Sequence, residues 1–192
     1  MKLLKGIIST IMLLVTFVSL QSCAVASLPV EQINFSKKSE KGMLMGSVTF
    51  PTDKPRFQGY FFRLNEKATQ EFQIDRSDLG QLDSGKTYLF LIERPVGVSE
   101  ISSVRLFHNS GFVAAQYDNQ IGGFTIPYEI KKGEITYIGN ITLNDYSKKG
   151  EVAVGYNNKF ERDLEELKKL QPSIDWSTVK NDETRKIEYN SK

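Results

Sequence analysis

Hydrophobic and polar positions change pattern twice along this chain. Residues 7–20 form an apolar run that is interrupted only by Ser and Thr. Residues 43–156 contain short apolar or alternating runs bounded by Gly, Pro, Asn or Asp, and their richness in β-branched and aromatic residues is typical of β-strands. Beyond them, Phe160, Leu164 and Leu167 recur at helical spacing. The pattern predicts an apolar leader, a β domain and one C-terminal helix.

The β region predicts a mainly β fold, an antiparallel β-sandwich. Residues 135–143 carry their large apolar side chains mostly at odd positions, which predicts one face toward a core and one toward water. Residues 88–92 are apolar throughout, so they predict a central strand covered on both faces. The candidate strands are residues 43–50, 57–64, 71–74, 87–93, 103–108, 112–117, 125–130, 135–143 and 151–156.

The C-terminal region predicts one amphipathic helix. Asn158 can cap it, Glu161 lies at the capping-box position, and Pro172 ends it. We expect the apolar stripe of this helix to pack on the sandwich; the alternative is an outward stripe that binds a partner. Ile174 and Trp176 are expected to fix the return of the chain to the domain.

The first residues have the three-part layout of an export signal. Lys2 and Lys5 give a positive start, the apolar run follows, and small Ser22 precedes Cys23, which is the only cysteine of the chain. Residues 7–20 are too few to span a bilayer, which takes about 20 apolar residues.

The segment Leu20-Gln21-Ser22-Cys23 resembles the lipobox of bacterial lipoproteins. The resemblance implies cleavage before Cys23, with Leu20, Gln21 and Ser22 as the cleavage flank, and a thiol that carries diacylglycerol with acyl chains such as palmitate. Several acyl chains make membrane attachment effectively permanent. The alternative is an ordinary secretory signal cleaved after Ala24-Val25-Ala26.

The residue after the cysteine bears on location. Ala24 stands where an aspartate would resemble the inner-membrane retention signal, and no acidic export tract follows. The resemblance therefore implies an outer-membrane anchor facing the periplasm where the host has an outer membrane. A Gram-positive outer-face anchor is the alternative.

Charge and length limit the function classes. Cleavage leaves 192 − 22 = 170 residues and removes two lysines from the 25 basic residues, so 23 basic residues balance 23 acidic ones. A neutral chain has no electrostatic footprint for nucleic acid. This length normally forms one domain, with no need for a disulfide. The expected parts are a signal peptide (1–22), a lipidated tether (23–41), the sandwich (42–156), the helix with its return segment (157–180) and a charged, frayed tail (181–192).

Two strand entries share a local pattern, in which a Gly turn leads into a strand carrying a Tyr. They run from Gly85 to Tyr88 and from Gly133 to Tyr137. The second resembles the strand entry of transthyretin-like and carboxypeptidase-regulatory-like β-sandwiches. Through Gly139 it is also similar to uncharacterised envelope lipoproteins that contain such domains. The resemblance implies a transthyretin- or immunoglobulin-like sandwich.

Residues 80–87 match the phosphate-binding pattern G-x-x-x-x-G-K-[ST] at every fixed position. A nucleotide site also needs a strand before the first Gly and a helix that begins at Lys-Thr. Here residues 75–78 are typical of a loop, and the apolar run after Lys86 is typical of a strand. We therefore expect a turn that binds no nucleotide.

Few residues offer catalytic or metal chemistry. His108 is the only histidine, and together with a lipidated Cys23 it cannot build the common zinc sites or a Cys–His dyad. No G-x-S-x-G elbow occurs. Asp75, Asp78 and Asp83 lack calcium-loop spacing and are expected to form turns. We expect no catalytic residue, metal or cofactor.

Aromatic residues supply the candidate binding surface. Phe57, Tyr60, Phe61 and Phe62 crowd one strand, and with Trp176 they could contact a sugar ring or a peptide. The alternative is that they form core. We expect a non-catalytic, lipid-anchored module of the cell envelope that binds, supports or assembles a protein or glycan partner. The alternatives are a carbohydrate- or peptide-binding lipoprotein, shown by an exposed aromatic row, and a carboxylate-dependent envelope hydrolase, shown by two close carboxylates in a cleft.

Overall fold

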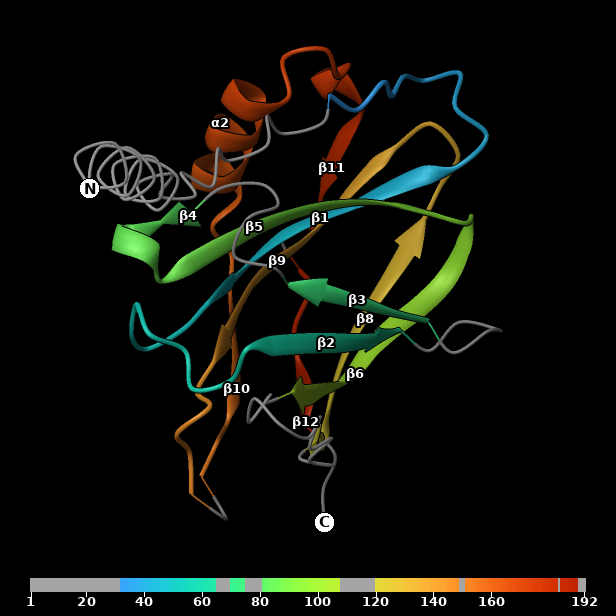
Figure 1. The fold of residues 1–192 in the computed structure, drawn as a ribbon. Coiled ribbons are helices and arrows are strands. Elements are labelled where there is room, and N and C mark those ends of the chain that lie inside the picture. The colour runs from blue at the N-terminus through green and yellow to red at the C-terminus, as the bar shows by residue number, and fades with distance from the viewer. Residues whose placement is uncertain are drawn as a thin grey trace, which may run out of the picture.

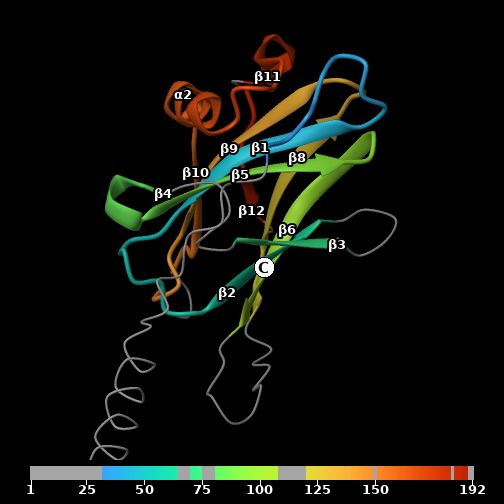
Figure 2. The same ribbon diagram turned by 45° about the horizontal axis from the view of Figure 1, so that its top comes forward.

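Two β-sheets packed face to face form the domain, and an α-helix lies on the outer face of one of them (Figures 1 and 2). The computed structural model describes residues 32–64, 70–74, 81–107, 120–148, 151–182 and 184–189. The fold is mainly β, as predicted. No helix within these ranges is long and apolar enough to cross a bilayer.

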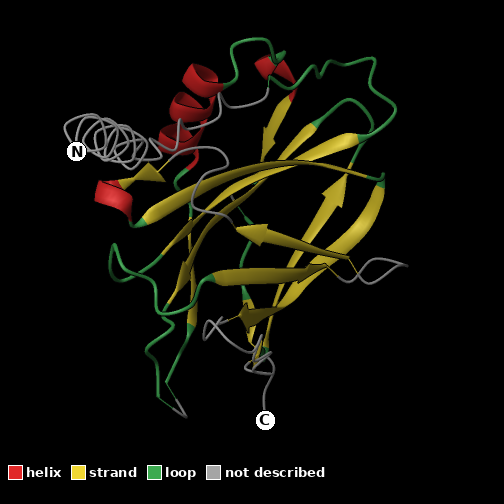
Figure 3. Ribbon diagram, in the orientation of Figure 1, coloured by secondary structure: helices red, strands yellow, loops and turns green. Residues whose placement is uncertain are grey.

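The sheet that carries the helix is called sheet A, and the other sheet B (Figure 3). Sheet A contains β1 (Gly42–Thr49), β4 (Gln81–Leu82), β5 (Thr87–Arg94), β9 (Ile135–Leu143), β10 (Val154–Asn157) and β11 (Val179–Asn181). Sheet B contains β2 (Gly59–Leu64), β3 (Gln70–Ile74), β6 (Gly97–Phe107), β7 (Gln120–Ile121), β8 (Phe124–Ile130) and β12 (Glu188–Tyr189). Most strand pairs are antiparallel as expected, but β9 runs parallel to both β1 and β11.

Most predicted strands are present, with small shifts at their ends. The larger difference is β6, which begins at Gly97 rather than at residue 103, because its first half alternates with exposed and polar positions. Strands β4, β7, β11 and β12 are two or three residues long, too short to give a periodic signal. The predicted strand at residues 112–117 lies outside the described residues.

The main core lies between the two sheets. Aromatic rings connect them, since Phe72 of β3 stacks on Phe62 of β2 and packs on Phe90 of β5, with 5.0 Å between ring centroids in each pair. Leu44 and Val48 of β1 point into the same core and are completely buried. Burial of apolar side chains of this size stabilises by about 1.5–3 kcal/mol each.

A second core lies between sheet A and the helix α2 (Phe160–Leu170). Leu167 is completely buried there among apolar side chains of β1, β5 and β9, with Phe160 and Leu164 packed at its margin. The stripe therefore packs on the sandwich as expected. The helix ends before Pro172 as predicted, but its N-cap is Lys159, so the expected capping box of Asn158 and Glu161 is wrong by one residue. The side chain of Asn158 still accepts a hydrogen bond from the amide of Phe160 (3.0 Å).

Both faces of sheet A are covered, which explains its apolar strands. In β5, Tyr88 and Phe90 enter the main core, whereas Leu89 and Leu91 lie under α2. The expected cover on both faces is confirmed at residues 88–92. The strand is not central, however, because its second neighbour among the described residues is the two-residue β4, which pairs only with Thr87 and Tyr88.

The expectation of a water-facing side for β9 is wrong. The register with β1 shifts by one residue between Tyr137 and Asn140, at Gly139, which has φ +102°. Because a bulge reverses the alternation, Tyr137 faces α2 whereas Ile141 faces sheet B. A Cβ on Gly139 would also lie 2.3 Å from Cε2 of Tyr156, so this position needs glycine.

The chain from Gln32 to Lys41 belongs to the folded domain, although we expected it within the tether. The amide of Ile33 donates to Oε1 of Gln171 (2.8 Å). Phe35 is only 2% exposed in the second core, and its carbonyl accepts from the amide of Asp175 (3.4 Å). The alternative to a tether was a docked first edge strand formed by Leu28, Val30, Ile33 and Phe35. Ile33 and Phe35 do dock, although residues 32–41 form no strand, and Leu28 and Val30 lie outside the described residues.

The C-terminal segment (residues 179–189) joins the two sheets along one edge of the sandwich. Its β11 pairs with β9 of sheet A, and its β12 pairs with β8 of sheet B (Figures 1 and 2). Residues 181–189, expected in a frayed tail, thus form part of the fold, except residue 183, which is not described.

Candidate functional site

A cluster of buried polar side chains lies between sheet A and the start of α2. Its centre is Asp163, whose side chain is 0% exposed. Oδ2 of Asp163 accepts from the hydroxyls of Ser47 (2.6 Å) and Tyr137 (2.9 Å), and Oδ1 accepts from Nε of Arg162 (2.9 Å). The carboxylate thus has three donors and a balancing cation, as a buried charge requires.

The cluster continues to the turn before β5. Arg162 also bonds Oδ2 of Asp83 through Nη1 (3.0 Å), and the hydroxyl of Thr87 donates to the same oxygen (2.6 Å). Asp83 and Ser84 adopt positive φ angles of 53° and 56°. These two bonds hold Asp83 in a conformation that non-glycine residues seldom adopt.

The chemistry of this cluster is structural. Burial raises the pKa of Tyr137, and the neighbouring Asp163 raises it further, so this phenol stays neutral and donates its proton. Ser47 and Asp163 are both completely buried, so no substrate reaches them. The carboxylates of Asp83 and Asp163 are bridged by Arg162 instead of facing a shared cavity.

The phosphate-loop match has the wrong structural context for a nucleotide. A short 3-10 turn (Asp83–Gly85) precedes Lys86, and β5 begins directly after it. The expected strand is confirmed, so there is no helix N-terminus here to hold phosphate. The hydroxyl of Thr87 already bonds Asp83. Gly80 lies outside the described residues.

Titration of the protein with ATP and magnesium is therefore expected to give no binding heat. Lys86→Ala should leave the calorimetric trace unchanged, since Lys86 ends a 3-10 turn directly before a strand and does not begin a helix that could hold phosphate. Saturable micromolar binding that disappears in Lys86→Ala would contradict this expectation.

The candidate aromatic residues do not meet on one surface. Phe57, Tyr60 and Phe62 are buried in the main core. Phe61 lies on the outer face of sheet B, and Trp176 packs against the second core with its indole Nε1 donating to the carbonyl of Gln171 (3.0 Å). Most of these side chains contribute to packing, which sequence alone could not distinguish from binding.

The ion pair of Arg105 and Glu71 covers Phe61, the candidate aromatic residue on the outer face of sheet B. The guanidinium carbon of Arg105 lies 4.2 Å from the centroid of the Phe61 ring. The same guanidinium binds both carboxylate oxygens of Glu71, at 2.6 and 3.2 Å, and this hydrogen bonding lowers the pKa of Glu71. Arg105 thus lies where a sugar ring would stack on Phe61.

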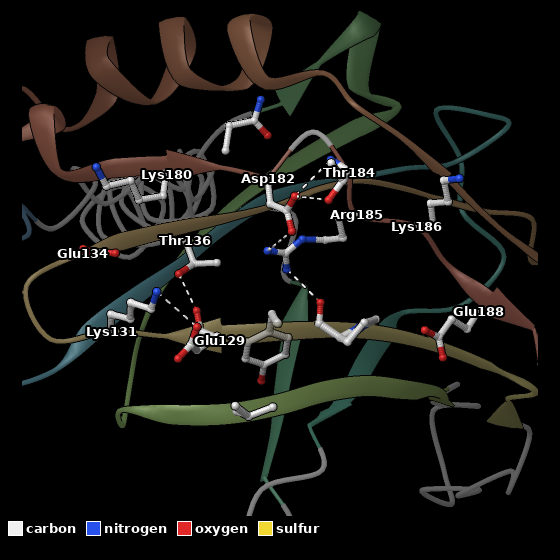
Figure 4. Close-up of a pocket in the computed structure, with 14 residues that line it drawn as sticks. Glu129, Lys131, Glu134, Thr136, Lys180, Asp182, Thr184, Arg185, Lys186 and Glu188 are labelled. Carbon is white, nitrogen blue, oxygen red and sulfur yellow. Dashed lines mark hydrogen bonds and ion pairs between the residues drawn. The ribbon is translucent and has the colours of Figure 1, made fainter.

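A groove of about 740 Å³ runs between β8 and the C-terminal segment (Figure 4). Its basic lining residues are Lys131, Lys180, Arg185 and Lys186. Four acidic residues, Glu129, Glu134, Asp182 and Glu188, also line it. Val98, which is 80% exposed, adds an apolar side chain. In the sequence these charges belonged to a strand, the turn after it, the return segment and the tail, and nothing connected them, because the groove forms only when sheets A and B are joined.

Arg185 is the buried charge of this groove, and its side chain is only 8% exposed. Its Nη1 donates to the carbonyl of Pro127 (2.9 Å), and its Nη2 lies 4.0 Å from Oδ2 of Asp182. Nε has no hydrogen-bond partner. Burial lowers the pKa of Arg185, while Tyr156 and Asp182 oppose that change.

Several predicted residues lie outside the described chain: Leu20, Gln21, Ser22, Cys23, Asp75, Asp78 and His108. Among the residues that the structure does describe, no three His, Cys, Asp or Glu side chains gather as metal ligands would. In comparisons with known proteins, no protein family, no curated protein and no solved structure matches this chain.

Proposed function

We propose that this protein is an exported lipoprotein that serves the bacterial cell envelope as a non-catalytic binding, structural or assembly module. The observation that carries the proposal is the position of Cys23, the only cysteine, at the end of an export signal. The finer assignment, a transthyretin-like or carboxypeptidase-regulatory-like lipoprotein facing the periplasm from the outer membrane, belongs to the same proposal.

The short distance between the anchor and the domain supports a role close to the membrane. The first residue that the structure describes is Gln32, and residues 24–31 lie between it and Cys23. A chain extends by at most about 3.6 Å per residue, so these residues reach at most about 30 Å. The side chain of Gln32 donates to the carbonyl of Leu170 (3.1 Å). In this proposal the chain enters the domain beside the C-terminal end of α2.

The described sites favour binding over catalysis. The buried pair of Ser47 and Asp163 is closed to substrate. The groove, in contrast, is open to solvent and offers charges of both signs next to exposed Val98. Surfaces of this mixed kind suit recognition of a polar partner.

Replacing Cys23 with alanine is expected to abolish fatty-acid labelling and to move the protein into the aqueous phase of a detergent partition. Without acyl chains the mature protein lacks the buried methylenes that hold it in the membrane. Ser27→Ala, a substitution just beyond the lipobox, is the matched control and should remain labelled. Unchanged membrane retention and labelling of Cys23→Ala would overturn the proposal.

A further inference from the structure

Residues 184–189 cross from the sheet A side of the sandwich to sheet B as a narrow segment, which we call the strap (Figure 1). Nη1 of Arg185 donates to the carbonyl of Pro127 (2.9 Å), and the hydroxyl of Tyr189 donates to the carbonyl of Val154 (2.8 Å). The backbone of the strap contributes β12, which pairs only two residues with β8. The strap is therefore attached to the rest of the domain at few points.

No residue of the strap is buried. All six are exposed or half-buried, whereas Thr178, just before β11, is only 3% exposed. Ile187 is the strap residue that packs against the main core, and Tyr189 is 53% exposed. Because burial of apolar surface is the main force that holds a segment in a fold, the strap is weakly held.

Arg185 further weakens the closed position of the strap. Its side chain is only 8% exposed, and its Nε has no hydrogen-bond partner. Its ion pair with Asp182 is long, 4.0 Å from Nη2 to Oδ2, while Oδ1 of Asp182 accepts from the amide of Thr184 (3.0 Å). A buried donor without an acceptor costs free energy. Water supplies the missing acceptor once the strap moves away.

The groove of about 740 Å³ lies between the strap and β8, so solvent already reaches the inner side of the strap. Figure 4 shows Arg185, Lys186 and Glu188 on one wall and Glu129 of β8 on the other. Because the strap forms one wall, the groove exists only while the strap is closed.

The two sheets have their own contacts without the strap. Strand β8 pairs with five residues of β6, and β10 pairs with four residues of β9. The buried residues of both cores come from elements other than the strap. We therefore expect the sheets and α2 to remain folded when the strap leaves.

We propose that the strap opens as a unit while the two sheets and α2 stay folded, and that this opening abolishes the groove. Local openings of this kind require less free energy than global unfolding. A ligand that contacts both walls binds the closed form alone and so keeps the strap shut. The inference goes beyond the proposed function, and it does not depend on the lipid anchor.

The test is hydrogen exchange of the full-length chain in detergent, followed by mass spectrometry at several low guanidinium concentrations. We expect strap peptides to exchange at least about ten-fold faster than peptides of β9, at a rate that guanidinium barely changes, because opening exposes little surface. Equal guanidinium dependence of strap and β9 would overturn the inference, since the strap would then open only with the whole domain. Exchange of every strap amide at the unprotected rate would also overturn it, because no closed strap would exist in solution.

Variants separate strap opening from global unfolding. Leu167→Ala destabilises the second core, so it should speed exchange of β9 and leave exchange of the strap within about two-fold of the parent. Leu164→Ala, which is only partly buried, takes its place if that variant fails to fold. Strap exchange that accelerates as much as β9 exchange would refute independent opening.

A second pair of variants tests the contacts that keep the strap closed. Ile187→Ala removes the contact of the strap with the main core and should speed strap exchange by about ten-fold. Lys186→Ala, an exposed substitution in the same strap, is the matched control and should exchange as the parent does. Equal exchange of the Ile187→Ala and Lys186→Ala straps would show that the strap is not closed by this packing, contrary to the inference.

Discussion

Replacing Asp163 with alanine is expected to lower the free energy of unfolding by about 3–5 kcal/mol. The change removes a completely buried carboxylate and leaves the hydroxyls of Ser47 and Tyr137 without their acceptor. It also removes one of the two acids that neutralise Arg162. Guanidinium-induced unfolding of the purified protein, followed by fluorescence or circular dichroism, measures the loss.

Two variants serve as controls for this result. Asp163→Asn keeps the shape and one acceptor oxygen, so its loss should be smaller than that of the alanine variant. Glu161→Ala lies on the exposed face of the same helix and should change stability by no more than about 0.5 kcal/mol. An unfolding midpoint of Asp163→Ala equal to the parent's would show that the buried cluster does not hold α2 in place.

Leu167→Ala is expected to cost about 2–5 kcal/mol, as truncations of buried leucine do. Leu167 is the completely buried residue of the stripe, whereas Leu164 is only partly buried. Leu164→Ala should therefore cost less than Leu167→Ala. The same chemical unfolding experiment measures both variants.

An exposed residue of the same helix provides the control for these leucine variants. Lys168→Ala, next to Leu167 on the exposed side, is the control and should stay within about 0.5 kcal/mol of the parent. Two leucine variants as stable as the parent would mean that the stripe does not pack on sheet A in solution. The stripe would then be available to a partner, by the helix-in-groove mode.

Both predictions concern the attachment of α2 to sheet A. Hydrogen bonds hold the start of this short helix, and apolar packing holds it one turn later. The polar cluster bonds Asp163 in the first turn of α2, and the apolar core holds Leu167 one turn further. An isolated helix as short as α2 is marginal in water. Tertiary contacts must therefore supply most of its stability.

The sequence by itself determined most of the longer elements and their type, whereas the strands of two or three residues left no signal in it. Apolar alternation and turn residues predicted these β-strands. The spacing of Phe160, Leu164 and Leu167 predicted the helix and its buried face. The apolar run after Lys86 was enough to predict a strand in place of a phosphate-binding helix. These features follow from local periodicity, which neighbouring residues carry on their own.

Only the tertiary structure decided which core each side chain enters. The bulge at Gly139 sends Tyr137 toward α2 and Ile141 toward sheet B, although both are apolar residues at odd positions. The bulge is a property of pairing with β1, and a single strand pattern does not contain it.

The polar sites were also decided by the tertiary structure. In the sequence Asp163 is one of several acids on a charged helix, and its buried role depends on Ser47, which lies 116 residues earlier. Likewise, Arg185 became a groove residue only because β11 and β12 join the two sheets and bring it to Pro127, 58 residues earlier. A buried charge is tolerated only with partners, and those partners come from distant parts of the chain.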